Sequence, residues 1–421
     1  MNKKYIPVIL TVIAIIIATL FWNKIVLTYD IQNQIHGEYL VNHYNANNDV
    51  LRFILFISLP LVVFLVSYLI LNNKKTFSLK QVILNKGEKT AQQKTDLNYD
   101  FIFIIFIIFL FAEFLSIDFS KFATNLDFFH EGTFLTSSSN SYFTKGLWSS
   151  SYVQSGLFGS FGPLFLWKLF GVKTIGLIRL SELCLLLLNK IFLVYFSKKI
   201  SKNLLFNERI KISYFIILSI LLISLISYED TWRFLPKSFL FLLFFLIFFN
   251  SLYQLNKFSF SFFLLGGFSI ISMLWFIDIG AYINILLLLI LTYFFIRNEF
   301  KKCISILFGI VFSWLAFIYI IPDHELKEFL NNTLLIYSTY DYIIGLIYPT
   351  PFLSGDTRST RVLLLIILAG ILVIIVNFNK NTKQTYYNKT LFIFLFIAAL
   401  LAFKTGMMRS DTPHIKSASG F

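Results

Sequence analysis

The feature that most constrains this chain is a succession of long apolar runs typical of membrane-spanning helices. Such a helix needs roughly 17–25 predominantly apolar residues. About eleven runs of this kind occur, at residues 5–26, 50–71, 101–117, 175–197, 212–228, 236–253, 258–277, 279–296, 303–321, 362–378 and 391–403. A soluble fold of 421 residues, 57% of them hydrophobic and 14% charged, could not bury so much apolar surface. The chain is therefore predicted to be an all-α integral membrane protein, a single polytopic domain over residues 1–421.

The N-terminus begins Met1-Asn2-Lys3-Lys4 and continues into the first apolar run, as a signal peptide does. No small-residue cleavage site follows, so this run is predicted to be retained as the first span.

A further apolar segment, residues 157–170, decides the topology. If it does not span and the N-terminus lies inside, most acidic residues fall outside, while the lysine- and arginine-rich connections fall inside, at residues 72–100, 198–211, 297–302 and 379–390. If the segment spanned, residues 198–211 and every later basic connection would lie outside. The positive-inside rule therefore predicts a multi-pass protein of the plasma (inner) membrane with a cytoplasmic N-terminus. Residues 157–170 are predicted to form a surface or re-entrant helix on the outer, periplasmic face.

The net charge of +14 would suggest a nucleic-acid partner in a soluble protein. Here the cytoplasmic connections account for the basic residues, so membrane lipids are expected and nucleic acid is not. Cys184 and Cys303 both lie in apolar stretches and indicate neither a disulfide framework nor a metal site.

Two outer loops are long, residues 119–156 and 322–361, and the first holds the sharpest cluster of ionisable groups. It reads Asn125-Leu126-Asp127-Phe128-Phe129-His130-Glu131-Gly132. Asp127 and Glu131 are four residues apart and would share one face of a helical turn. A carboxylate here could act as a general base, or the two could hold a divalent cation such as Mg²⁺ or Mn²⁺. The alternative is a solvated loop with a helix cap.

Other charged residues on the predicted outer side are candidates for binding a substrate. Asp278 lies alone between two apolar runs at the tip of a short hairpin, where a charge is more often part of a site than incidental, although a tight hairpin also needs a polar tip. Arginine suits bidentate capture of phosphate, and salt bridges to outer acids are the alternative. The remaining candidates are Arg233, Arg358, Arg361, Arg409, Asp411 and His414.

Two weaker features concern packing. Gly266-Gly267 predicts close helix contact. Lys190 lies within residues 175–197, close enough to the inner end to extend its ammonium group into the headgroup region. The sequence contains no phosphate-binding glycine loop, no His-Glu-x-x-His and no nucleophile elbow, so ATP-driven and classical hydrolase chemistry lack support.

The outer-loop motif Asp127-Phe128-Phe129-His130-Glu131-Gly132, followed by a helix expected to lie along the membrane, resembles the GT-C class of polytopic glycosyltransferases. That class includes relatives of protein mannosyltransferases and lipid A aminoarabinose transferases. The segment Arg409-Ser410-Asp411-Thr412-Pro413-His414 also looks like a late motif of bacterial members with a His-Glu-Gly loop. The resemblance implies a sugar donor carried on a polyprenyl phosphate and an acidic residue acting as base or metal ligand.

The resemblance also implies roles for the candidate residues. Asp127 would deprotonate an acceptor hydroxyl, with help in proton transfer from His130 and His414. Glu131, Asp278 or Asp411 would orient the sugar or the acceptor. The departing polyprenyl phosphate would be stabilised by arginines among Arg233, Arg358, Arg361 and Arg409. A metal, if one binds, would be held by Asp127 and Glu131.

Three alternatives remain. A transporter or flippase for a lipid-linked saccharide predicts ionisable residues at mid-membrane depth and internal repeats; few of the former and none of the latter are evident. A polysaccharide polymerase or ligase would concentrate its arginines and histidines in one late outer loop and would not need Asp127. A structural or assembly membrane protein would need no catalytic residues.

Overall fold

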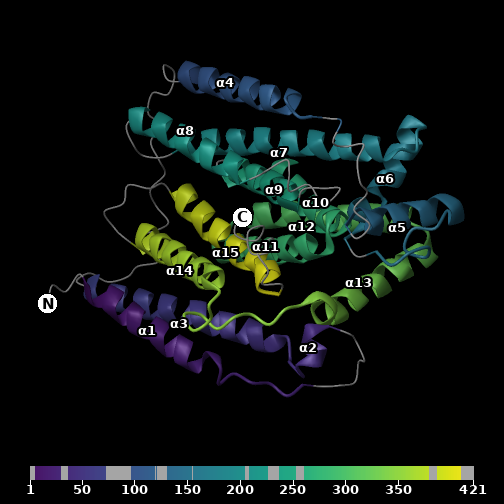
Figure 1. Cartoon of the computed structure of the whole chain (residues 1–421). Coiled ribbons are helices and arrows are strands. Elements are labelled where there is room, and N and C mark those ends of the chain that lie inside the picture. The colour runs from purple at the N-terminus through teal and green to yellow at the C-terminus, as the bar shows by residue number, and fades with distance from the viewer. Residues whose placement is uncertain are drawn as a thin grey trace. The chain divides into compact units, whose positions relative to one another are not determined.

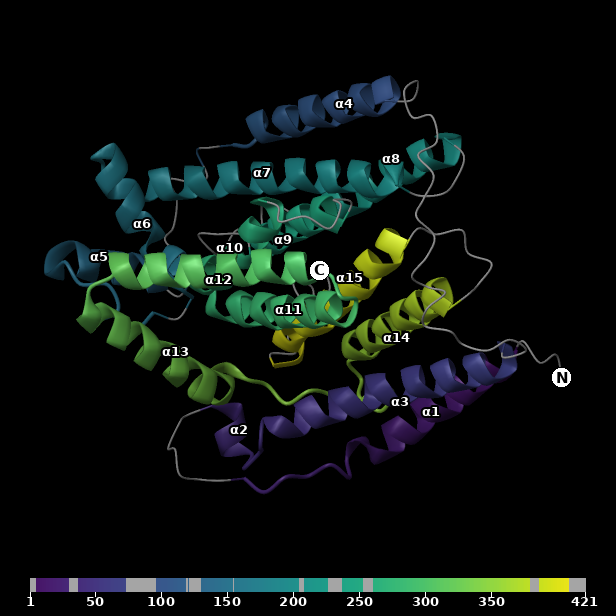
Figure 2. The same cartoon turned by 180° about the vertical axis from the view of Figure 1, so that it is seen from behind.

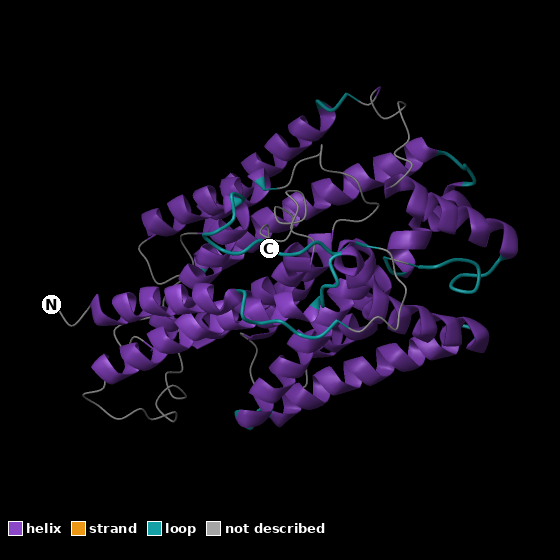
Figure 3. Ribbon diagram, turned by 60° about the horizontal axis from the view of Figure 1, so that its bottom comes forward, coloured by secondary structure: helices purple, strands orange, loops and turns teal. Residues whose placement is uncertain are grey.

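The computed structural model describes residues 5–29, 37–72, 96–118, 120, 130–153, 155–203, 208–225, 237–252, 260–378 and 386–408. Within these residues the chain forms fifteen helices and no strand (Figures 1 and 3). The all-α prediction is confirmed. Packing divides the chain, which is predicted from its sequence to be one polytopic domain, into two compact units. Unit 1 comprises Met1–Glu88 and Leu335–Phe421, and unit 2 comprises Lys89–Leu334.

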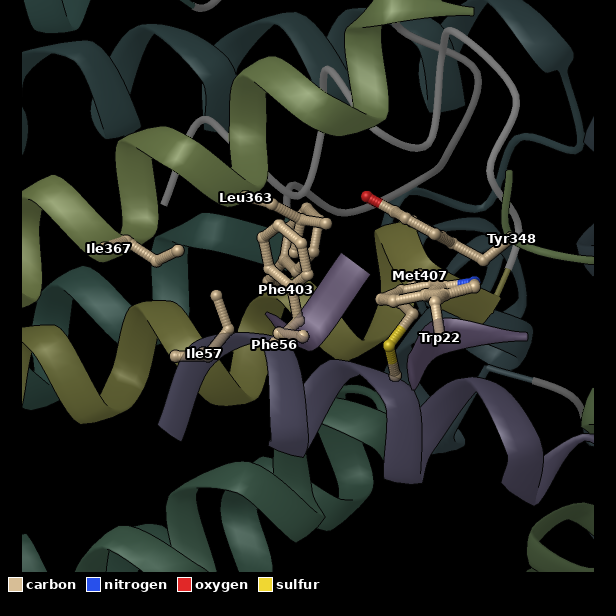
Figure 4. Close-up of a cluster of buried hydrophobic side chains, with 9 residues drawn as sticks. Trp22, Phe56, Ile57, Tyr348, Leu363, Ile367, Phe403 and Met407 are labelled. Atoms are coloured by element: carbon tan, nitrogen blue, oxygen red, sulfur yellow. The ribbon is translucent and has the colours of Figure 1, made fainter. Parts of the chain in front are cut away.

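Unit 1 is built around α3, which packs against α1, α14 and α15. Its core holds Trp22, Phe56, Tyr348 and Phe403 (Figure 4), and the Trp22 ring meets the edge of Phe56 at 5.8 Å between ring centroids. Large aromatic side chains at a helix crossing bury much apolar surface, which stabilises the contact. The helices of this unit are α1 (Ile6–Trp22), α2 (Glu38–Val41), α3 (Asn47–Asn72), α14 (Thr357–Phe378) and α15 (Tyr386–Met408).

Unit 2 contains two packed groups of helices. In one, α7 packs against α4, α8 and α9; in the other, α10 packs against α9, α11 and α12 (Figure 2). The bounds are α4 (Asp96–Leu115), α5 (His130–Thr144), α6 (Leu157–Phe170), α7 (Ile175–Lys202), α8 (Glu208–Ser224), α9 (Lys237–Leu252), α10 (Phe260–Trp275), α11 (Ile277–Ile296), α12 (Phe300–Ile320) and α13 (Asp323–Ile344), whose last residues belong to unit 1.

Two glycines allow α10 and α12 to pack closely in unit 2. A Cβ on Gly266 would lie 2.8 Å from the backbone nitrogen of Ile310 and 3.0 Å from Cα of Gly309. The first distance is shorter than real Cβ contacts allow, and the Cβ would also overlap the carbonyl oxygen of Ile306, so a side chain there would force the helices apart. A Cβ on Gly267 would meet nothing within 4 Å. The predicted close packing is confirmed for Gly266 alone.

Each of the eleven predicted spans contains a helix, but only some of these helices have the dimensions of a span. Among the described residues, four are long and apolar enough to cross a bilayer: Asn47–Leu71, Ile277–Ile296, Phe300–Ile320 and Ser359–Phe378. They indicate a membrane protein, whereas the number of eleven spans stays a prediction. Helix α6 has the bounds predicted from the sequence. Its 14 residues reach about 21 Å, less than the roughly 30 Å of a bilayer's hydrocarbon core.

Candidate functional site

One end of unit 2, here called the α5–α6 end, brings together the residues that follow the acidic motif. Helices α5 and α6 pack on one another there, beside the first turn of α7 and the start of α13 (Figures 1 and 2). Ser138 Oγ on α5 donates to the carbonyl of Ser160 on α6 at 3.0 Å. The same end contains an apolar cluster that includes Trp148, Phe161 of α6 and Phe329 of α13.

The connection between α5 and α6 is fastened to α13 by two polar side chains. Glu325 Oε1 accepts a hydrogen bond from the Leu147 N–H at 2.9 Å, and Oε2 accepts one from the Ser149 N–H at 3.1 Å. The Ser149 hydroxyl also donates to Glu325. Asn332 both accepts from the Val153 N–H at 2.9 Å and donates to its carbonyl at 2.8 Å. The bonds from Asn332 satisfy the backbone groups of Val153, which would otherwise be buried without partners.

The central feature of this end is an ion pair between α5 and α7. Glu131 lies in the first turn of α5, where the helix dipole favours a carboxylate. Arg179 on α7 donates from Nε to Glu131 Oε1 at 2.6 Å and from Nη2 to Oε2 at 2.7 Å. Both side chains are only 12% exposed. The bidentate geometry is the strongest arrangement available to an arginine and a carboxylate, and it fixes the start of α5 against α7.

A second carboxylate, Glu182, lies close to this pair. It is three residues beyond Arg179 on α7 and interacts electrostatically with both Arg179 and Glu131. Its side chain is buried, with 4% of the residue exposed, and no described residue hydrogen-bonds to its carboxylate. The cluster therefore combines two carboxylates with one guanidinium.

Farther along α7, Lys190 forms another ion pair. Its Nζ lies 2.7 Å from Glu113 Oε1 on α4, and its side chain is 2% exposed. The prediction that Lys190 extends toward the inner headgroup region is wrong, because an acid inside the bundle binds the ammonium group instead. At 100° per residue, Arg179, Glu182 and Lys190 share one face of α7, together with the buried Asn189. This helix thus carries a stripe of polar side chains on its protein-facing side.

The structure places some of the predicted site residues and leaves others outside the described part of the chain. Glu131 belongs to the cluster on unit 2, and His130 begins α5. Asp278 lies in the first turn of α11, two residues after Phe276, the single residue that separates α10 from α11, so the predicted hairpin tip is confirmed. Arg358 and Arg361 lie on α14 of unit 1, and Arg361 is exposed. The residues outside the described ranges are Asp127, Arg233, Arg409, Asp411 and His414.

Arg179, Glu182 and Glu113 were not singled out by the sequence analysis, although a signal was present. Arg179 and Glu182 stand three residues apart within an apolar run, so that they share a helix face. Ionisable residues inside a predicted span mark functional sites by default, and they pair with one another inside the protein. What the run alone could not supply was the partner from another helix.

The structure gives limited information on the predicted metal site. Among the described residues, no group of three or more His, Cys, Asp or Glu side chains is placed to hold a metal ion. The predicted ligands were Asp127, which lies outside those residues, and Glu131, whose two oxygens both accept hydrogen bonds from Arg179.

No protein-family model, no curated protein and no solved structure matches this chain.

Proposed function

We propose that the protein is a membrane glycosyltransferase that moves a sugar from a polyprenyl-phosphate donor to an acceptor on the outer face of the membrane. The observation that carries this proposal is the buried bidentate pair between Glu131 and Arg179. It ties the last acid of the Asp127–Glu131 motif to the charged face of α7, so the chain leaves Asp127 only four residues from a fixed point on the bundle. A catalytic group needs such a rigid attachment to hold its orientation.

Two further features support the proposal. The loop that carries the motif continues into α5 and α6, which are 15 and 14 residues long and pack against one another. Short helices in the first large outer loop are what the GT-C resemblance implies. In addition, Asp278 starts α11 in the same unit, where its carboxylate could bind hydroxyl groups of a sugar.

The proposed reaction is a single displacement at the anomeric carbon. Asp127 accepts the proton of the acceptor hydroxyl as its oxygen bonds to that carbon. The bond between the carbon and the phosphate oxygen breaks, and its electron pair leaves with the polyprenyl phosphate. An arginine side chain stabilises that charge, and Arg233 is the candidate. His130 assists proton transfer, and Asp278 orients the sugar or the acceptor.

In this scheme Glu131 acts on Arg179. Because both Glu131 oxygens already accept hydrogen bonds, the residue is better suited to position the guanidinium than to bind a cation. A divalent cation held by Asp127 together with the donor phosphate remains compatible with the scheme.

The test is sugar transfer by the Asp127→Asn variant in proteoliposomes that contain a polyprenyl-phosphate-linked, radiolabelled sugar. Loss of a general base slows a reaction about 10²–10⁴-fold, so transfer should fall to background while expression stays normal. Asp118→Asn is the matched control, because Asp118 is an exposed acid just beyond α4 and its substitution should leave transfer unchanged. Full activity of Asp127→Asn would overturn the mechanism.

A second candidate, a transporter for a lipid-linked saccharide, is favoured by one observation. Arg179, Glu182 and Lys190 place three ionisable groups on the protein-facing side of α7, as expected for a membrane transport pathway. The same proteoliposomes separate the two candidates. Movement of the intact lipid-linked sugar across the bilayer, unaffected by Asp127→Asn but abolished by Glu182→Gln, would identify a transporter.

A further inference from the structure

The C-terminal ends of α5 and α6 meet around one lysine. Lys173 follows α6, and its Nζ lies 4.7 Å from the ring centroid of Tyr142, 4.8 Å from Phe143 and 5.2 Å from Trp167. The first two rings belong to the last turn of α5 and the third to the last turn of α6. An ammonium group within about 6 Å of aromatic faces is attracted by their quadrupoles, so Lys173 holds the two helix ends together.

Two more lysines lie beside these rings. Lys145 ends α5 with a positive φ of 63°, two residues after Phe143, and Lys168 is next to Trp167. All three lysines are exposed, and no acid among the described residues forms an ion pair with any of them. If this end faces outward, as predicted, three unpaired lysines depart from the positive-inside rule and need another explanation.

The same surface exposes large apolar side chains. Phe143 on α5 is 74% exposed and Leu169 on α6 is 75% exposed. Beside them, Phe170 is 57% exposed and Val172 is 50% exposed. Helix dipoles favour cations at helix C-termini and account for part of the lysine placement. They do not account for apolar side chains directed outward between the lysines.

We propose that this surface, defined by Lys145, Lys168, Lys173, Phe143, Leu169 and Phe170, docks on the anionic phospholipids of the membrane in which the protein lies. The lysines bind headgroup phosphates, and the apolar side chains enter the boundary between headgroups and acyl chains. Aromatic side chains with lysines around them are the composition that interfacial helices use to lie in this boundary. The surface would hold α5 and α6 at a fixed depth and so keep the start of α5 level with α7.

The proposal does not depend on the protein being a glycosyltransferase, and its test needs no activity. The purified full chain is titrated in mild detergent with phosphatidylglycerol or phosphatidylcholine, and bound lipids are counted by native mass spectrometry. The wild type should bind phosphatidylglycerol in preference to phosphatidylcholine. Each lysine near an anionic surface contributes roughly fivefold, so Lys145→Gln/Lys168→Gln/Lys173→Gln should weaken phosphatidylglycerol binding on the order of a hundredfold.

Matched variants separate the proposed contacts from general charge. Lys327→Gln removes an exposed lysine from α13 and should change nothing. Phe143→Ala/Leu169→Ala keeps every charge and should still weaken phosphatidylglycerol binding, because the apolar contacts are lost. Unchanged preference in the triple lysine variant would overturn the proposal. So would displacement of the lipid by soluble glycerol phosphate, because a free phosphate site would then explain the lysines without a bilayer.

Discussion

Lys190 on α7 and Glu113 on α4 form an ion pair, with 2.7 Å between Nζ and Oε1, and the lysine side chain is almost wholly buried. The two helices also share an apolar cluster that includes Tyr99 of α4, Leu187 and Val194 of α7 and Phe215 of α8. A charge in such surroundings is tolerated when its partner is in place and is costly when the partner is removed.

Removing only one member of this pair should therefore destabilise the protein. Lys190→Met leaves the Glu113 carboxylate without its cation, and we expect a loss of about 2–3 kcal/mol, below the roughly 3–5 kcal/mol of fully buried pairs because Glu113 is 33% exposed. The double variant Glu113→Gln/Lys190→Met should recover most of that loss. Thermal unfolding of the purified chain in detergent measures both, and equal unfolding temperatures for the two variants would contradict the pairing.

The bidentate contact between Arg179 and Glu131 should matter more for function than a simple charge. Arg179→Lys keeps the charge but cannot donate two parallel hydrogen bonds. We expect sugar transfer to fall about 10–100-fold, the equivalent of one charged hydrogen bond, with little loss of folded protein. Glu328→Gln, on α13, serves as the control. Wild-type transfer rates in Arg179→Lys would remove Arg179 from the site.

The two neighbouring glycines of α10 should respond in opposite ways to alanine. Gly266→Ala places a methyl group against the backbone of α12 and should cost about 1–3 kcal/mol. Gly267→Ala meets open space and should be neutral or stabilising by up to about 1 kcal/mol, because alanine favours a helix. Unfolding curves of both variants, measured side by side, decide the matter; similar destabilisation by both would be inconsistent with the described contact.

The attachment of the α5–α6 connection to α13 should weaken in acid. Burial raises the pKa of Glu325. Hydrogen bonds from the Ser149 hydroxyl and from the N–H groups of Leu147 and Ser149 together lower the pKa by more than burial raises it, so the pKa lies below its ordinary value of 4.5. A carboxyl group whose pKa is lower in the folded state stabilises that state above the unfolded pKa. The contribution is lost as the pH falls below 4.5 and through the folded pKa.

Fluorescence of Trp148, which belongs to this connection and packs against Phe329 of α13, should report that change. With Trp148 as the only tryptophan retained, the acid transition of the wild type should be displaced or flattened in Glu325→Gln, which cannot titrate. An unaltered acid transition in that variant would mean that another group controls it.

Local sequence pattern predicted the features that depend on a single stretch of chain. The bounds of α6, the hairpin tip at Asp278 and the close approach at Gly266 all follow from the order of apolar residues, glycines and charges along one or two adjacent helices. The prediction that Lys190 extends to the headgroup region was wrong, because its ammonium group binds Glu113 on another helix, which the sequence of α7 alone does not show.

The sequence by itself determined that this chain is helical and belongs in a membrane, because long apolar runs have no other stable solution in which every backbone group is hydrogen-bonded. It also marked Glu131 as a residue of interest from its neighbours alone. Only the tertiary structure decided that Glu131 binds Arg179, 48 residues away, and that Glu182 joins them. Such pairings depend on which helix faces pack together, and side-chain contact across helices is not encoded in the periodicity of either helix alone.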